Sequence, residues 1–118
     1  MGFIKTLTTS TGAAINVAYG SIGAFESEIV NISDTGGDVA IAVTSNSGGT
    51  PKLKIKVGMD PAAMDFLLDT NQLVIELSIP ATKKRFVISK VLFPYFQVVG
   101  SANGTTSGAL TDITIRVI

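Results

Sequence analysis

The sequence contains no cysteine, no histidine and no tryptophan among its 118 residues. The missing cysteine excludes disulfides and thiolate metal sites. The missing histidine removes the commonest general base and the commonest side-chain metal ligand. With these groups absent, we expect no catalytic residues, no metal site and no cofactor.

Charge is also scarce. Charged residues make up 15% of the chain, with nine basic and nine acidic residues, whereas ordinary soluble domains contain about 25%. The neutral balance removes the long-range field that draws proteins to nucleic acid or anionic membranes. Hydrophobic residues reach 46% and the mean hydropathy is +0.46. A small domain with this composition has too few polar residues to cover its surface. We therefore expect part of that surface to be buried against other chains.

Long hydrophobic runs are missing as well. No window approaches 18 consecutive apolar residues, and the first residues lack a basic start followed by an apolar run. The first observation predicts no membrane span and the second no signal peptide. We therefore expect neither a membrane nor a specific nucleic acid among the partners.

What the sequence has in abundance is alternation of apolar and polar residues, the period of a β-strand. The length suits a single domain over residues 1–118, with residues 1–10 as an arm or an edge strand. Turn signals every 8–14 residues predict an all-β, antiparallel sandwich of jelly-roll type with about eight strands. One short helix is predicted near 60–69, where Asp60 can cap and Pro61 suits the first helical position. The alternating segments are Phe3–Ser10, Ala14–Tyr19, Phe25–Ile32, Val39–Ser45, Lys52–Val57, Leu73–Ile79, Arg85–Phe93, Tyr95–Ala102 and Asp112–Ile118.

Basic residues concentrate in two segments. In PKLKIKVGMD, Pro51–Asp60, the lysine row Lys52, Lys54 and Lys56 alternates with apolar residues. The second cluster is Lys83, Lys84 and Arg85. If the two segments are neighbours, they form one positive patch that could dock an acidic partner surface. The simpler interpretation is a solvated strand face that lysine protects from edge pairing. The residues between the lysines are aliphatic rather than aromatic, which argues against a nucleic-acid site.

Small residues on outer strand faces suggest contacts with other subunits. In Val39–Ser45, Ala40 and Ala42 oppose a core face of Val and Ile, so a neighbouring surface can pack closely there. The predicted subunit contacts are Phe3, Ile4, Ala40, Ala42, Tyr95 and Phe96.

Acidic residues offer the other candidate chemistry. Glu26 and Glu28 share one face of a strand, about 7 Å apart, the arrangement a glycosidase would need. No aromatic platform for a sugar accompanies them, so we interpret them as partners of a basic strand such as the lysine row. Two further acidic runs, Asp34 with Asp38 and Asp60–Asp69, lack the spacing of a calcium loop. A structural calcium ion is left open.

The closing segment Phe93–Ile118 reads FPYFQVVGSANGTTSGALTDITIRVI. An aromatic pair, Tyr95 and Phe96, enters a strand, a Gly/Ser/Asn/Thr loop follows, and a β-branched strand ends the segment. This pattern resembles the last two strands of discoidin-like jelly-roll domains. It also looks like the small decoration, or cement, proteins of tailed-phage capsids, which are short, cysteine-free and often trimeric. That resemblance implies a homo-oligomer, with a trimer favoured, that binds a major capsid protein.

The leading hypothesis from sequence is therefore a non-enzymatic virion protein that oligomerises and stabilises a capsid lattice. It would be made in the host cytoplasm and reside in the virion. The alternative is a carbohydrate-binding or adhesion module of the same architecture, with its site in the loops Ser45–Thr50 and Ser101–Ser107. An enzyme that uses Glu26 or Glu28 ranks third.

Overall fold

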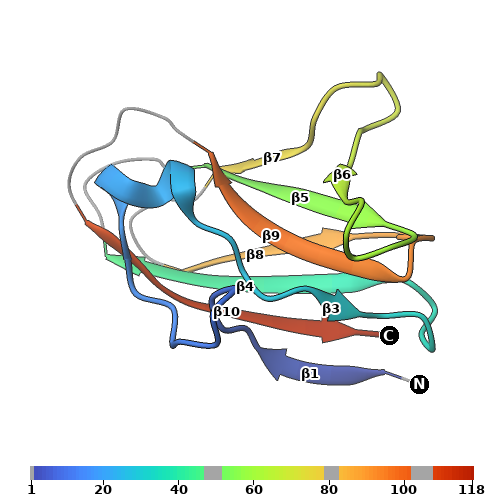
Figure 1. Cartoon of the computed structure of the whole chain (residues 1–118), viewed down its shortest axis with the longest axis horizontal. Helices are drawn as coiled ribbons and strands as arrows, with labels where there is room; N and C mark the ends of the chain where they lie inside the picture. Colours follow the sequence, from blue (N-terminus) through green and yellow to red (C-terminus); the bar gives the residue numbers. More distant parts are fainter. Residues whose placement is uncertain (1, 47–51, 79–82, 102–107) are drawn as a thin grey trace.

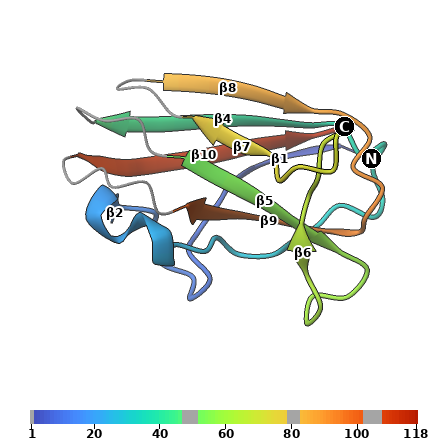
Figure 2. The ribbon, with the colours of Figure 1, turned by 90° about the horizontal axis from the view of Figure 1, so that it is seen from above.

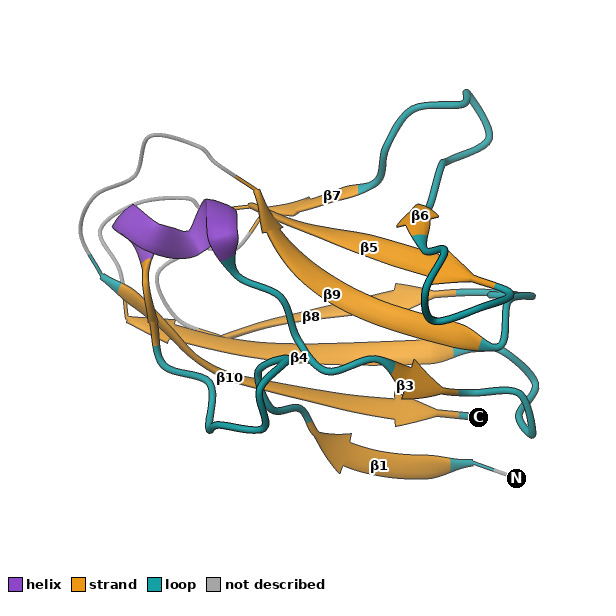
Figure 3. Ribbon diagram, viewed as in Figure 1, coloured by secondary structure: helices purple, strands orange, loops and turns teal. Residues whose placement is uncertain are grey.

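The alternating segments fold into two antiparallel sheets packed face to face (Figures 1 and 3). The computed structural model describes residues 2–46, 52–78, 83–101 and 108–118, and in these ranges the chain forms ten strands and one short 3-10 helix. Figure 1 shows the layers, with β5 and β9 above β4 and β10. The predicted fold class, an all-β antiparallel sandwich, is confirmed.

The first sheet has the order β1-β10-β4-β8, and β2 also pairs with β10. The register between β4 and β10 runs from Val39 opposite Val117 to Asn46 opposite Ala109, with one irregularity between Leu110 and Asp112. The strand bounds are β1 Phe3–Thr6, β2 Val17–Ala18, β4 Val39–Asn46, β8 Lys83–Ile88 and β10 Ala109–Val117.

The second sheet has the order β3-β9-β5-β6, and β7 also pairs with β5. Its two long central strands are bordered by short pieces, as the view from above in Figure 2 shows. The 3-10 helix η1, Tyr19–Ala24, lies beside β9. The strand bounds are β3 Val30–Asn31, β5 Lys52–Gly58, β6 Asp65–Phe66, β7 Glu76–Ser78 and β9 Tyr95–Ser101.

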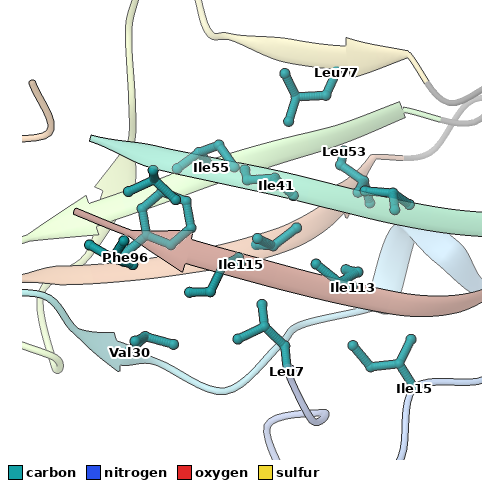
Figure 4. Packing of buried hydrophobic residues seen from close by; sticks show 14 of the residues in the cluster. Leu7, Ile15, Val30, Ile41, Leu53, Ile55, Leu77, Phe96, Ile113 and Ile115 are labelled. Atoms are coloured by element: carbon teal, nitrogen blue, oxygen red, sulfur yellow. The ribbon is translucent and has the colours of Figure 1, made fainter. Parts of the chain in front are cut away.

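The core lies between the sheets and follows the alternation in the sequence. In β5, Leu53 and Ile55 are completely buried while the lysines between them are half-exposed. Phe96 fills the centre together with aliphatic residues from both sheets (Figure 4). Full burial of each such side chain contributes about 1.5–3 kcal/mol. The same alternation buries Val39, Ile41 and Val43 in β4 and Ile113, Ile115 and Val117 in β10.

The predicted helix near 60–69 is wrong. Asp60 accepts hydrogen bonds from the backbone N–H of Ala62 (2.9 Å) and, through its carbonyl, of Ala63 (3.0 Å), so the segment begins as a turn. The chain then pairs with β5 through Asp65 and Phe66. A segment of about two helical turns has little stability of its own, so strand pairing outweighs the local helix signal.

Several short strands of the two sheets also differ from the predicted strands. Of Phe25–Ile32, only Val30–Asn31 is a named strand, and Ala14–Tyr19 contributes only Val17–Ala18 before η1 begins. The predicted apolar face of Leu73–Ile79 holds only in part, because Leu77 is buried but Leu73 is 63% exposed. Ile79 lies outside the described residues.

The two ends of the described chain are neighbours. Residues Phe3–Thr6 form an edge strand of the first sheet rather than a free arm, with Phe3 opposite Val117. Gly2 packs so closely that a Cβ there would meet the backbone of Val117 and Ile118. Both labelled ends lie at the same end of the sandwich in Figure 1.

Candidate functional site

The two basic segments of the sequence lie in different sheets. The lysine row occupies β5 in the second sheet, and Lys83, Lys84 and Arg85 begin β8 in the first. They are separated because β8 pairs with β4 rather than with β5. The two segments therefore do not form one positive patch, and their role in docking stays a prediction for each segment separately.

Phe66 stands on the outer face of the second sheet beside the lysine row. It is opposite Lys56 in the register between β5 and β6. The ammonium groups of Lys54 and Lys56 each lie 5.2 Å from the centre of its ring. A cation at this distance is attracted to the ring face by about 0.5–1 kcal/mol at an exposed site. Among the described residues, no carboxylate forms an ion pair with the lysine row.

A recess opens between this aromatic ring and the segment that follows η1. It has a volume of about 200 Å³. Half-exposed Lys56 and Phe66 form one part of its lining, and exposed Glu26 forms another. We call it the outer-sheet recess. Its lining residues are Gly23, Ala24, Phe25, Glu26, Lys56, Phe66, Val99 and Gly100.

The side of the recess that carries Glu26 is fixed by buried polar groups. Ser27 is completely buried, and its hydroxyl accepts the N–H of Val98 (3.0 Å) and donates to the carbonyl of Glu28 (2.9 Å). The side-chain amide of Gln97, also buried, donates to the carbonyl of Ser27 (2.8 Å). Buried polar groups that are fully bonded hold a segment in one position, so Glu26 is presented from a rigid backbone.

Gly100 allows η1 to lie against β9. A Cβ at this position would overlap the carbonyl oxygen of Ile22 in η1. The backbone N–H of Gly100 donates to the carbonyl of Phe25 (3.0 Å) just after η1. The absence of a side chain at Gly100 therefore lets η1 and the following residues form one wall of the recess.

Glu26 and Glu28, the predicted carboxylate pair, have different neighbours. Glu28 forms an ion pair with Lys5 (2.6 Å) and accepts hydrogen bonds from the backbone N–H (2.8 Å) and hydroxyl (2.9 Å) of Thr8. Burial raises the pKa of the Glu28 carboxyl, but the bonds from Lys5 and Thr8 and the charge of Lys5 outweigh burial and lower it overall. Within this chain, Glu28 is therefore paired with Lys5 of β1 rather than with the lysine row.

The predicted subunit contacts fall at different depths. Phe96 is completely buried in the core, so it cannot touch another subunit, and that prediction is wrong. Ile4 is 70% exposed, while Ala40 and Ala42 are half-exposed on the outer face of the first sheet. Phe3 and Tyr95 are also half-exposed. For these five residues, a role in subunit contacts stays a prediction.

The loops predicted for sugar binding lie mostly outside the described residues, apart from their first residues. Within the described ranges, acidic side chains do not gather in a group of three or more that could hold a metal ion. No helix in the same part of the chain has the length and apolarity to cross a membrane.

The outer-sheet recess itself was not found from the sequence. Phe66 lies in the segment predicted as a helix, so its position opposite Lys56 was hidden. Glu26, Lys56 and Phe66 come from three distant parts of the chain, and sequence spacing does not show that they meet. The one signal in the sequence was the alternation around Glu26. This alternation places Glu26 on the exposed face of its segment and the adjacent Ser27 on the buried face.

Comparison with protein-family models and with curated proteins finds no match. Among solved structures, the carbohydrate-binding module named BiXyn10A CBM1 is similar, with a TM-score of 0.48 and 12% identity over 93% of this chain and 79% of that one. The C-terminal CBM6 of LamC, a marine laminarinase from Zobellia galactanivorans, is also similar. Its TM-score is 0.44, and it has 13% identity over 96% of this chain and 90% of that one.

A third structure contains CBM51-2, in complex with GlcNAc, and INT domains of Clostridium perfringens ZmpB. It gives a TM-score of 0.40 and 14% identity over 98% of this chain and 28% of that one. None of these three proteins is described as a capsid protein. At this level of similarity, the comparisons carry no argument about what this chain binds.

Proposed function

We propose that this chain is a non-catalytic carbohydrate-binding module whose ligand sits in the outer-sheet recess. The observation that supports the proposal is the convergence of Phe66, Lys56 and Glu26 on one small hollow. This corresponds to the alternative hypothesis from sequence, but with a different site from the two loops predicted there.

The three side chains supply the kinds of contact that a saccharide ring needs. A sugar presents an apolar C–H face and hydroxyl groups that both donate and accept hydrogen bonds. The ring of Phe66 offers an apolar surface, the ammonium of Lys56 only donates, and the carboxylate of Glu26 only accepts. The single charges of opposite sign in the recess fit a neutral sugar better than a strongly acidic one.

The size of the recess limits what it holds. Sites for drug-sized ligands span roughly 300–1,000 Å³, whereas this recess has about 200 Å³. It therefore fits about one saccharide residue, and a longer glycan would continue over the exposed sheet face beside Lys54.

Catalysis by a carboxylate pair is disfavoured by the surroundings of Glu28. Glycoside hydrolysis needs two carboxyl groups that both reach the scissile bond. Both oxygens of the Glu28 carboxylate are already bound, Oε1 by Lys5 (2.6 Å) and Oε2 by the N–H (2.8 Å) and hydroxyl (2.9 Å) of Thr8. Glu28 is absent from the lining of the recess, where Glu26 is the acidic residue. We therefore propose binding without hydrolysis.

A glycan array probed with the full chain tests this proposal, followed by calorimetry with the strongest ligand. We expect Phe66→Ala to weaken binding by about tenfold or more, because the apolar platform is lost. Lys56→Ala and Glu26→Gln should each weaken it about fivefold, the value of one hydrogen bond.

Matched controls lie on the same sheet face. Lys52→Ala and Glu76→Gln change the same residue types at positions that do not line the recess, and with a monosaccharide as ligand they should leave affinity unchanged. A broad array without binding contradicts the proposal. So does a Lys52→Ala variant that loses as much affinity as Lys56→Ala.

A second candidate function is attachment to a capsid lattice, the leading hypothesis from sequence. The outer face of the first sheet supports it, because Ile4, Arg116, Ala40 and Val87 lie in register across β1, β10, β4 and β8. Half-exposed Ala40, between exposed Arg116 and exposed Val87, leaves a shallow strip that another sheet could cover.

Mass spectrometry of density-banded virions from cells that carry the gene tests this second candidate. The chain should be present at a fixed ratio to the major capsid protein. Ala42→Arg, which places a large charged group in the middle of this face, should reduce that ratio severalfold, whereas Ala63→Arg, on an exposed turn, should not. Virions that lack the chain would contradict this function.

A further inference from the structure

Four exposed hydrophobic side chains gather at one end of the sandwich. Met59 follows β5, Leu68 follows β6, and Leu92 and Phe93 lie between β8 and β9. Their exposed fractions are 72%, 43%, 82% and 40% respectively. We call this set the apolar end. Figure 1 shows the β5–β6 and β8–β9 connections at the same end of the molecule.

The apolar end contains two hollows that share a ridge. The larger, about 510 Å³, is lined by Leu68 and by residues of β5 and β6. The smaller, about 350 Å³, is lined by Leu92 and by Ile32, Val91 and Pro94. Met59 and Phe93 line both hollows and so form the ridge between them. An exposed apolar surface of this kind, with cavities, is typical of an interaction site.

The backbone beneath the smaller hollow is fixed by hydrogen bonds. The N–H groups of Lys90 and Val91 donate to the Asp38 carboxylate (3.0 Å) and the Gly37 carbonyl (2.8 Å). On its other side, the N–H of Ile32 donates to the carbonyl of Pro94 (2.7 Å). A surface that is already ordered loses little conformational entropy when it is covered, which favours association.

The shape of the apolar end is self-complementary. Leu92 is the most exposed of the large hydrophobic residues in the described ranges, and it stands at the rim of a hollow that is larger than a leucine side chain. A two-fold contact requires that one patch supply both the protruding group and its receptor. Here the protruding leucine and the hollow lie side by side.

The charges around this hollow are also self-complementary. Asp60 follows the ridge residue Met59, and Lys90 precedes Val91 in the lining. Within the described part of the chain, neither side chain forms an ion pair, although the Asp60 carboxylate accepts the N–H of Ala62. In a two-fold contact, a pairing of Lys90 of one copy with Asp60 of the other would occur twice. Asp65, which lines the larger hollow, adds acidic charge on the same side as Asp60.

We propose that two copies of this chain associate through the apolar end about a two-fold axis, with each Leu92 entering the smaller hollow of the other copy. The smaller hollow, which receives Leu92, shares no lining residue with the outer-sheet recess, whereas the larger hollow shares Phe66 with it. A dimer of this kind carries two recesses, which strengthens binding to a repeated ligand by avidity.

Sedimentation velocity of the full chain over a concentration series tests the proposal. We expect a monomer of 12.2 kDa to give way to a species of twice that mass as concentration rises. Leu92→Asp should weaken association about tenfold or more, because it places a charge in an apolar contact. The control is Leu73→Asp, the same change at a leucine that is 63% exposed and lines neither hollow, and it should leave association unchanged.

A charge exchange tests the orientation of the two copies. Asp60→Lys alone and Lys90→Asp alone should each weaken association, and the double variant should restore it. Lys90 has a positive φ of 56°, a conformation that aspartate tolerates well, so Lys90→Asp should fold. Circular dichroism of each variant checks the fold.

Three results would overturn the proposal. The first is a wild-type chain that stays monomeric at all concentrations. The second is an oligomer that Leu92→Asp leaves intact, or that Leu73→Asp disrupts equally. The third is a folded double charge variant that associates no better than either single one. Glycan binding by a monomer would leave the function of the recess standing while removing this contact.

Discussion

The two sheets of this sandwich differ in how their outer faces are covered. On the first sheet, Ala40 and Arg116 lie in register between Ile4 and Val87, and these two flanking side chains are well exposed. On the second sheet, η1 and the segment after it lie against β9, so that the outward residues Gln97 and Val99 are buried. The outer-sheet recess forms where this cover ends, so an incomplete third layer, rather than either sheet alone, creates the hollow.

The largest loss of stability should come from a substitution that prevents the close approach of η1 to β9. Gly100→Ala places a Cβ where the carbonyl of Ile22 lies, and we expect a loss of about 3 kcal/mol in unfolding free energy. Urea denaturation measures it. Gly12→Ala is the control, because Gly12 has a φ of +88° but no atoms near its added Cβ. It should cost about 1 kcal/mol or slightly more, from backbone strain alone. Equal losses in the two variants would contradict the role given to Gly100.

A smaller effect should follow from removing a buried polar group under the cover. Ser27→Ala deprives the N–H of Val98 of its acceptor in a completely buried position, and we expect a cost of about 2 kcal/mol. The matched change on the uncovered sheet is Thr44→Ala, at a half-exposed position, which should alter stability by less than about 0.5 kcal/mol. If the two variants were equally stable, the second sheet would not depend on this bonded segment.

The smallest effect concerns the link between the covering segment and β1. Glu28→Gln weakens the contacts with Lys5 and Thr8, and we expect a loss of about 1 kcal/mol at neutral pH, since the pair is partly exposed. The folded-state pKa of Glu28 is lowered, so its stabilisation is present above the unfolded pKa and is lost as pH falls through the folded value. The variant and wild type should therefore converge in stability under acid conditions. A constant difference down to pH 2 would contradict this origin.

The sequence predicts the long strands well because their alternation reports a core on one side and solvent on the other. In β5 the apolar residues Leu53 and Ile55 alternate with the lysine row, and in β4 Val39 and Ile41 alternate with alanine. In both strands, only one face is apolar enough to lie on the core. The helix near 60–69 fails because Asp60 and Pro61 give a strong local start signal, whereas the pairing of Phe66 with β5 is a contact between segments. Local signals cannot rank these two outcomes.

The candidate sites were harder to predict than the fold for a related reason. The sequence shows Glu26 as a member of a carboxylate pair and Lys56 as a member of the lysine row, but it does not show that they are neighbours across the recess. Leu92 and Met59 attract no attention in the sequence, where single apolar residues near strand ends are ordinary. Their significance depends on the connections β5–β6 and β8–β9 meeting at one end of the fold. The buried position of Phe96 shows the converse error, because an aromatic at a strand start was interpreted as a contact when it belongs to the core.

The antiparallel pairing of β1 with β10 brings Gly2 beside Ile118, and this adjacency makes the chain suitable for circular permutation. A short glycine-serine linker would join the present ends, and new ends could be opened in an exposed turn such as the one around Asn71. Such a permutant would retain every strand pair described above. The same property would allow the domain to be inserted as a unit into a surface loop of a carrier protein.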